Sequence, residues 1–288
     1  MEVCKASHHA FEVSPPRVKK SSASTEECFR LFNHRTNACS YLVGFCHGFV
    51  FISGCYFLPL YFQAVRNSTP LLSGVYVLPY VLSLSCCSGA IGVVISRTGR
   101  YQEAIWGAVC LMALGSGLLV LFDRTTGWAE LVISQLIAGI GSGPLFQAPL
   151  IAIHSTIEPQ DLATATAAFS FVRTLGTSLA VSLGLVVFQN GMAHQADDPT
   201  LLRSLGAEAT RRIAGGSASA SIDYIKTLGP AQRRVAQDAY AQGMRGMWWF
   251  FMAVAVVGVV CRIGIGKVAP PKRPGRGADS ATQQGDTI

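Results

Sequence analysis

The sequence predicts an all-α polytopic membrane protein with six transmembrane helices, and three observations lead to this fold class. Half of the 288 residues are hydrophobic and only 14% are charged, whereas soluble domains carry about 25% charged residues. The mean hydropathy is +0.38. Each crossing of a bilayer requires ~17–25 mostly apolar residues. Stretches of that kind cover residues 38–64, 71–96, 104–122, 131–153, 163–188 and 246–268.

Residues 1–36 precede the first stretch and are polar and basic. They contain no apolar core of the signal-peptide type, so we expect an N-terminal tail followed by a span that acts as the insertion signal. That span contains a lone histidine, His47, in the run GFCHGFVF, and Gln63 near its end. A histidine among glycines and aromatic residues favours a hydrogen-bonded packing residue. A role in carrying protons stays open.

The second stretch, 71–96, follows the tripeptide Asn67-Ser68-Thr69. This tripeptide is a glycosylation sequon, so Asn67 is a candidate modification site. Its closeness to the end of a span and the following Pro70 disfavour modification.

The third stretch, 104–122, contains no charged residue, and all sixteen acidic residues of the chain lie outside the six stretches. Proton-driven transport usually needs a carboxylate or a histidine within the membrane. Only His47 and His154 are available for that task. The spans therefore offer no acid to couple with a buried cation.

The fourth stretch, 131–153, contains a glycine-rich run that is followed by two prolines. Gly139 and Gly143 form a GxxxG face, which permits close helix packing. Pro144 and Pro149 should bend the helix. The run lies inside an apolar helix, so it does not fit a phosphate-binding loop, which needs a preceding strand.

Two glutamines, Gln135 and Gln147, bracket this bend and lie near one face of the helix. Polar groups beside a kinked, glycine-lined helix indicate the wall of a cavity. Tight packing alone is an equal alternative.

The fifth stretch, 163–188, carries one arginine, Arg173, which would cost roughly 2.5–3.5 kcal/mol at the centre of a span. Gly176, Ala180 and Gly184 recur near its angular position on a helix. Such a face of small residues packs closely against another helix, so we expect Arg173 to face the bundle. Two interpretations stay open: a structural arginine bonded to helix carbonyls, or an arginine bordering a substrate or proton path.

Residues 190–245 separate the fifth and sixth spans and have helix-like apolar spacing with glycine breaks. We expect an extracytoplasmic loop with one or two short surface helices. The sixth span, 246–268, then leads into a C-terminal tail at 269–288.

The distribution of basic residues predicts the orientation, because short cytoplasmic loops carry an excess of Lys and Arg. The opposite side has only Arg66 and Arg124 in its short loops. Both termini should therefore be cytoplasmic in a multi-pass protein of the cell membrane. The richer side holds Arg17, Lys19, Lys20, Arg30, Arg35, Arg97, Arg100, Arg262, Lys267, Lys272, Arg273 and Arg276.

Several function classes are disfavoured by composition and motifs. The net charge of +7 follows from membrane topology, and we expect no binding to nucleic acid. The nine cysteines form no CxxC pair, and we expect no metal site and no cofactor. Six-span intramembrane proteases need a G-x-S-G serine, and Ser53, Ser116 and Ser142 do not match it. We therefore do not expect an enzyme.

The segment after the second span, GVVISRTGRYQEAIWGA, resembles the loop signature of the major facilitator superfamily, G-x-x-x-D-R-x-G-R-[RK]. Gly92, Arg97, Gly99 and Arg100 match that signature. Ser96 stands in the place of the acid, and a tyrosine stands in the place of the last basic residue. In the family this loop is cytoplasmic, in agreement with the distribution of charge.

Wider stretches over roughly residues 29–268 resemble the fourteen-span drug:proton antiporter branch, in particular fungal toxin and multidrug efflux members. The resembling runs include TPLLSGVYVLP, GIGSGPLFQAPLIAI and ATATAAFSFVRTLGTSLAVSLGLVVFQNGM. The chain resembles the C-terminal half of such a transporter alone, with Gln135 in the place of the family's fourth-helix arginine. The resemblance implies inverted repeats of three helices within the half.

The resemblance also implies a function, namely efflux of a hydrophobic small molecule such as a fungal secondary metabolite, toxin or drug. The substrate pathway would include Gln63, Gln135, Gln147, Arg173 and His47. The expected partners are the lipid bilayer, the substrate, protons, and a second transporter half or a second copy of this chain. The alternative is a truncated, transport-incompetent half-transporter or a membrane interaction subunit.

Overall fold

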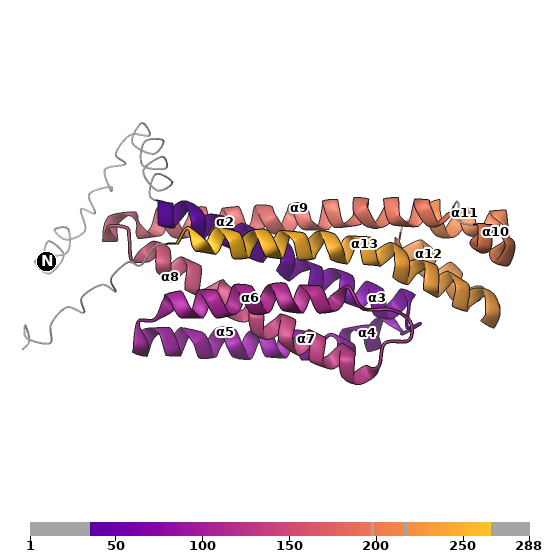
Figure 1. Cartoon of the computed structure of the whole chain (residues 1–288), viewed down its shortest axis with the longest axis horizontal. Coiled ribbons are helices and arrows are strands. Elements are labelled where there is room, and N and C mark those ends of the chain that lie inside the picture. Colours follow the sequence, from indigo (N-terminus) through magenta and orange to yellow (C-terminus); the bar gives the residue numbers. More distant parts are fainter. Residues whose placement is uncertain (1–34, 197–198, 216–217, 266–288) are drawn as a thin grey trace, which may run out of the picture.

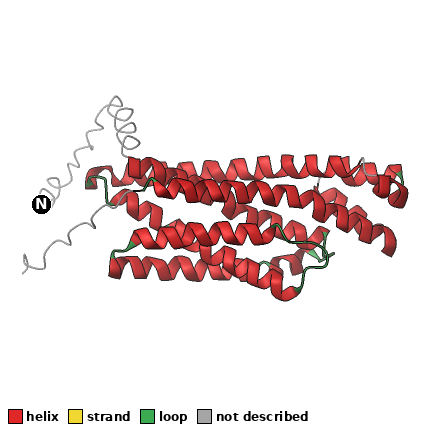
Figure 2. Ribbon diagram, in the orientation of Figure 1, coloured by secondary structure: helices red, strands yellow, loops and turns green. Residues whose placement is uncertain are grey.

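The structure is a computed structural model that describes residues 35–196, 199–215 and 218–265. These residues form helices joined by short loops, with no strand among them (Figure 2). Six of the helical segments are long and apolar enough to cross a membrane, and the predicted fold class is confirmed. Of the two expected tails, only Arg35 and Thr36 lie within the described residues, where they begin the first helix.

The six spans run roughly side by side along one long axis (Figure 1). The first consists of α2 (Arg35–Ile52), the π-helical turn η1 (Ser53–Phe57) and α3 (Leu58–Ala64), and the short α4 (Pro70–Tyr76) follows it. The second and third are α5 (Leu78–Thr98) and α6 (Tyr101–Leu119). The fourth consists of α7 (Trp128–Ser142), the 3₁₀ turn η2 (Gly143–Phe146) and α8 (Ala148–His154). The fifth is α9 (Leu162–Ala196), preceded by the 3₁₀ turn η3 (Pro159–Asp161), and the sixth is α13 (Pro230–Ile263).

Prolines explain three of the interruptions, because a proline nitrogen cannot donate to the carbonyl four residues earlier. Pro59 follows the π turn, Pro79 follows the break between α4 and α5, and Pro144 lies in η2. Of the two prolines expected to bend the fourth span, Pro144 lies where the helix changes from α to 3₁₀ geometry, and Pro149 lies in the first turn of α8. The second span was expected as one helix over 71–96, but α4 and α5 are separate and meet at Val77.

The fifth and sixth helices are longer than expected and occupy part of the region 190–245. α9 continues to Ala196, and α13 begins at Pro230 rather than near residue 246. A proline suits the first turn of a helix, because its missing N–H would have no partner there. The short helices α10 (Pro199–Leu205), α11 (Ala207–Gly215) and α12 (Ala218–Thr227) lie between them. They are not simply surface helices, since their apolar side chains Leu201, Ile213, Ile222 and Ile225 are buried.

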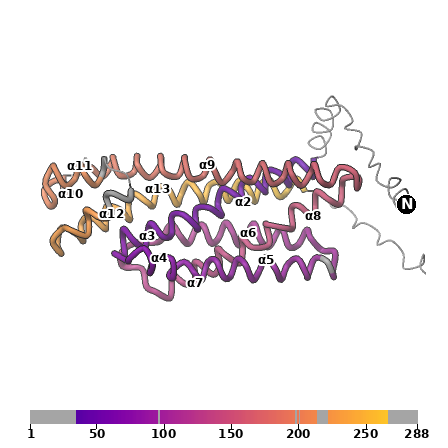
Figure 3. The backbone as a smooth tube through the Cα atoms, turned by 180° about the vertical axis from the view of Figure 1, so that it is seen from behind, coloured from indigo at the N-terminus to yellow at the C-terminus, as the bar shows by residue number. Residues whose placement is uncertain are grey.

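The helices pack in two groups, and in each group one span of one triplet packs against two spans of the other triplet (Figure 3). α2 of the first span packs against α9 and α13, the fifth and sixth spans. α7 of the fourth span packs against α5 and α6, the second and third spans. α6 and α13 join the two groups. This pattern is what a two-fold relation between the first and second triplets of helices requires.

Glycines allow the closest of these approaches. A Cβ on Gly48 of α2 would overlap the backbone carbonyl of Arg173 on α9, and one on Gly176 would overlap the carbonyl of Phe45. The predicted face of small residues on α9 is buried at Gly176, Ala180 and Gly184. Gly176 lies against Phe45 of α2, and Gly184 lies against Phe57 of η1 and Phe251 of α13.

Candidate functional site

Arg173 lies at the edge of the contact between α2 and α9, where its side chain is only partly buried. Its guanidinium lies 5.0 Å from the ring centre of Phe146 in η2 and 5.8 Å from that of Phe169, one turn earlier on α9. A cation–π contact contributes about 0.5–1 kcal/mol at an exposed site and about 2 kcal/mol when desolvated. Two such contacts on a partly buried guanidinium offset part of the roughly 2.5–3.5 kcal/mol that an arginine costs within a membrane.

The guanidinium of Arg173 has neither a hydrogen bond nor an ion pair among the described residues. Within the described residues, Arg173 is therefore not bonded to helix carbonyls as a structural arginine would be. The rings hold the cation, and its N–H donors remain available for a carbonyl, an ether oxygen or an anionic group of a ligand.

His47 joins the same cluster from α2 and is fully buried. Its ring meets the Phe146 ring edge-on at 4.6 Å, and Phe51 lies 5.1 Å from Phe146 between ring centres. Within the described residues neither ring nitrogen of His47 makes a regular hydrogen bond, although the Ser142 backbone lies close. The expected hydrogen-bonded packing role is thus incomplete, and a buried imidazole with two open nitrogens is an unusual arrangement.

His47, Phe51, Phe146, Phe169 and Arg173 together form what we call the aromatic–arginine cluster. It joins α2, η2 and α9. The break at η2 places Phe146 between the histidine and the arginine, and the close packing at Gly48 brings the Arg173 backbone against α2. The three phenylalanines were not among the predicted site residues. Phe169 could have been identified from the sequence, because it lies four residues before Arg173 and hence on the same helix face.

The three predicted glutamines do not share one set of partners. Gln63 at the end of α3 donates from Nε2 to the Ser73 hydroxyl of α4 at 3.0 Å. Gln135 on α7 is buried, and its Oε1 has no hydrogen-bond partner among the described residues. Gln147 directly follows Phe146 and lies against Gly92 of α5, where an added Cβ would be 2.6 Å from its Oε1. Of the three, only Gln147 neighbours a member of the aromatic–arginine cluster in sequence, and its side chain lies against α5.

The other predicted residues lie at the helix ends. His154 of α8 is 2.8 Å from the Thr166 hydroxyl of α9. Asn67 is exposed with a φ of 54°, a left-handed conformation that asparagine tolerates better than most residues. Its glycosylation stays a prediction.

The loop between α5 and α6 carries the matched signature residues. Gly99 ends α5 with a φ of 70°, which favours glycine, and its N–H donates to the Ile95 carbonyl. Arg97 and Arg100 are exposed, and Arg100 pairs with Glu103 at 2.6 Å. The signature thus forms a tight turn with basic side chains directed outward.

The family model of the Major Facilitator Superfamily matches residues 9–181. The efflux pump dotC of Dothistroma septosporum is 45% identical over 83% of this chain and 40% of its own length. The MFS-type transporter ppz2 of Metarhizium majus is 40% identical over 78% of this chain and 38% of its own length. The Acurin A biosynthesis cluster MFS-type transporter of Aspergillus aculeatus is 30% identical over 86% of this chain and 44% of its own length. The chain thus spans about 40% of the length of the first of these curated relatives.

Proposed function

Because the chain belongs to the major facilitator superfamily, we propose that its six helices form half of an efflux transporter for a hydrophobic small molecule. The observation that carries this proposal is the 45% identity to a protein named as an efflux pump over 83% of this chain. A fungal secondary metabolite is the favoured substrate class, since another relative is named for a biosynthesis cluster.

The aromatic–arginine cluster is the part of the chain best suited to meet such a substrate. Its rings offer apolar surface, and the partly buried guanidinium of Arg173 offers donors without a competing carboxylate among the described residues. A flat, oxygen-bearing hydrophobic molecule matches this combination of ring faces and donors. Gln147 follows Phe146 directly in sequence, and its side chain lies against α5.

The exposure of two helices supports the need for a second bundle. Only 17% of the membrane-spanning stretch of α5 and 22% of that of α9 is buried, whereas 67% of the first span is buried. The exposed side of α9 carries Ser170, Thr174 and Ser178. The hydroxyls of Thr174 and Ser178 donate to the carbonyls of Ser170 and Thr174 in their own helix. We propose that a second set of helices, from the same or another polypeptide, covers α5 and α9. Alternating access in this fold class moves two such units around a site between them.

A transport-incompetent subunit remains the second candidate function. It is favoured by the described spans, in which Glu103, Glu130 and Asp161 lie at helix ends and Asp238 lies eight residues after the start of α13, all of them away from mid-span. Under the efflux proposal, His47 is the group that would carry a proton within the bundle. We further propose that both termini are cytoplasmic and that the protein lies in the cell membrane.

The efflux proposal is tested by replacing Arg173 in an assembled transporter. The chain would be co-expressed with the part of dotC that it does not match, and export of hydrophobic dyes would be measured in membrane vesicles. Arg173→Met should insert normally yet reduce export at least about tenfold, the size expected when one charged hydrogen-bonding contact is lost. Leu175→Met, an exposed change on the same helix, serves as the matched control. Export at the original rate in Arg173→Met would remove the assignment of this residue.

A further inference from the structure

An open pocket of about 360 Å³ lies at the end of the bundle where the α3–α4 loop, the α6–α7 loop and the first turns of α13 meet. Its lining includes three arginines, a tryptophan and two uncharged polar residues: Arg66, Arg124, Arg234, Trp128, Ser68 and Gln237. No acidic residue lines it within the described part of the chain. It is distinct from the aromatic–arginine cluster, which shares none of these residues.

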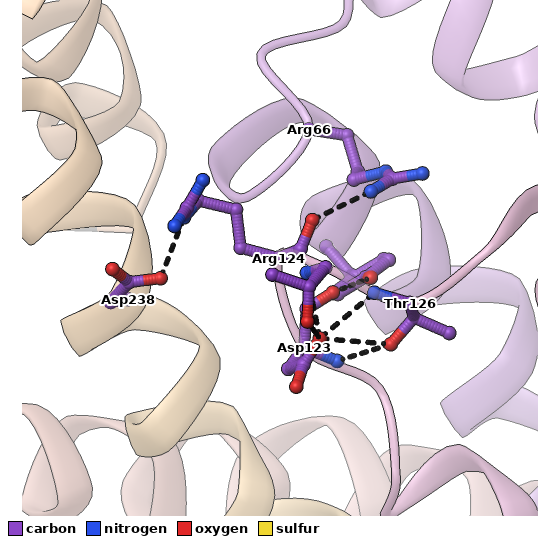
Figure 4. A network of polar contacts seen from close by, with 7 residues as sticks. Arg66, Asp123, Arg124, Thr126 and Asp238 are labelled. Carbon is purple, nitrogen blue, oxygen red and sulfur yellow. Dashed lines mark hydrogen bonds and ion pairs between the residues drawn. The ribbon is translucent and has the colours of Figure 1, made fainter.

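Two contacts hold Arg66 in place. Its Nη1 donates to the backbone carbonyl of Arg124 at 2.7 Å (Figure 4). Its guanidinium also lies 5.0 Å from the ring centre of Trp128. Both contacts use part of the guanidinium and leave its charge without a carboxylate partner among the described residues. Arg66 is therefore a fixed cation at the pocket wall.

The carboxylates near the pocket do not line it, and only one of them pairs with a lining arginine. Asp238 pairs with Nε of Arg124 at 2.7 Å, so one of the three arginines is compensated. The carboxylate of Asp123 accepts hydrogen bonds from the backbone N–H groups of Thr125 and Thr126 within its own loop (Figure 4). Arg234 is exposed and has neither a hydrogen bond nor an ion pair among the described residues. Two arginines that have no carboxylate partner among the described residues, Arg66 and Arg234, thus line the same pocket.

We propose that this pocket binds an oxyanion group, a phosphate or a carboxylate, that is attached to an apolar body. Guanidinium groups match the geometry of such oxyanions and bind them with charge-assisted hydrogen bonds. The Trp128 ring, which is about half exposed, offers an apolar face beside them.

The position of the pocket leaves two sources for this group. Its lining residues follow the ends of apolar spans, the level at which the headgroups of a ~30 Å hydrocarbon core begin and at which tryptophans gather. A phospholipid headgroup and a dissolved anion therefore share the required chemistry. Their affinities distinguish them.

The test is calorimetric titration of the purified chain in non-ionic detergent. One arm uses inorganic phosphate, and the other uses dihexanoyl phosphatidic acid, a short lipid with the same headgroup. Arg234→Gln is the main variant, because this exposed side chain supports no described contact. Arg66→Gln is the second. Arg245→Gln is the matched control, since Arg245 is an exposed arginine of the same helix that does not line the pocket.

We expect saturable binding in at least one arm, weakened about tenfold by Arg234→Gln and by Arg66→Gln and unchanged by Arg245→Gln. Tighter binding of the lipid than of inorganic phosphate assigns the pocket to headgroups, and equal binding assigns it to dissolved anions. Asp238→Asn should strengthen binding, because it frees the third arginine. Absence of saturable binding in both arms, or equal weakening by Arg245→Gln, would overturn the proposal.

Discussion

At the scale of single residues, the energetics of Arg173 decide what this arginine can do. An unpaired guanidinium in a membrane span requires compensation, and the faces of Phe146 and Phe169 supply it while leaving the N–H donors open. A carboxylate partner would have compensated the charge more strongly but would also have occupied those donors. Ring faces therefore suit a cation that has to remain available to a ligand.

The Phe146 ring should contribute measurably to stability, since it contacts Arg173, His47 and Phe51. We predict that Phe146→Leu lowers the free energy of unfolding by about 1–3 kcal/mol through the lost ring contacts and the space left behind. Thermal unfolding in detergent measures the change. Phe171→Leu, a substitution at a ring that is 68% exposed, should have little effect, and an equal loss in both variants would contradict the account.

The Asp123 carboxylate links stability to pH at the loop end of α6. Partial burial alone would raise its pKa, but hydrogen bonds from the hydroxyl and N–H groups of Thr125 and Thr126 hold the pKa below its usual value of 3.8. Because the folded pKa is the lower one, the stabilisation is fully present above the unfolded value and is lost as the pH falls through the folded value. We predict that Asp123→Asn reduces the dependence of the unfolding temperature on pH below about pH 5. An acid dependence identical to that of the original chain would show that this carboxylate is not responsible; Glu208→Gln is the control.

The sequence could identify part of the candidate site. Arg173 was recognisable as a charge in an apolar run, and its position on the face of small residues was readable from helix periodicity. The role of Phe146 was not readable, because it depends on the 3₁₀ turn that displaces this ring toward α2 and α9. Spacing within one helix cannot say which ring of another helix meets a cation.

At the scale of helices, apolar run length and proline chemistry account for most of the fold. All six spans were predictable, since a bilayer imposes a minimum length on each of them. The extension of α13 back to Pro230 was not, because residues 230–245 are polar in composition and their helix is stabilised by tertiary packing. Buried Ala236, Ala239 and Tyr240 provide that packing. The pair Gly229–Pro230 was the feature of the sequence that could have indicated where this helix begins.

The contact between α2 and α9 depends on glycine, and its loss should be costly. A side chain at Gly48 would have to displace the Arg173 backbone, so Gly48→Ala should destabilise the protein by about 1–3 kcal/mol, as overpacking does. Gly107→Ala on α6 has nothing within 4 Å of the new methyl group. That control should be neutral or stabilising by up to about 1 kcal/mol, since alanine favours helix over glycine. Equal destabilisation by the two changes, measured by chemical unfolding, would refute the close-contact account.

At the scale of the whole molecule, the contact pattern suggests a bundle built from two related triplets and made to meet a second unit. The first span contacts the fifth and sixth, the fourth contacts the second and third, and α6 meets α13 between them. Such a bundle satisfies its own central contacts but leaves α5 and α9 largely uncovered. Because small and hydroxyl-bearing residues on a lipid-facing helix gain little from lipid, a covering bundle is the arrangement that uses them.

We propose that these six helices transport only together with a second bundle. The most direct test is to reconstitute the purified 288-residue chain in liposomes with a pH gradient and a panel of hydrophobic dyes. The chain would be present alone in one preparation and with the unmatched part of an efflux-pump relative in the other. We predict gradient-dependent dye movement only in the second preparation, and its loss in Arg173→Ala. Dye movement by the chain alone, abolished by Arg173→Ala or His47→Ala, would contradict the claim and indicate a pair of identical chains acting as a whole transporter.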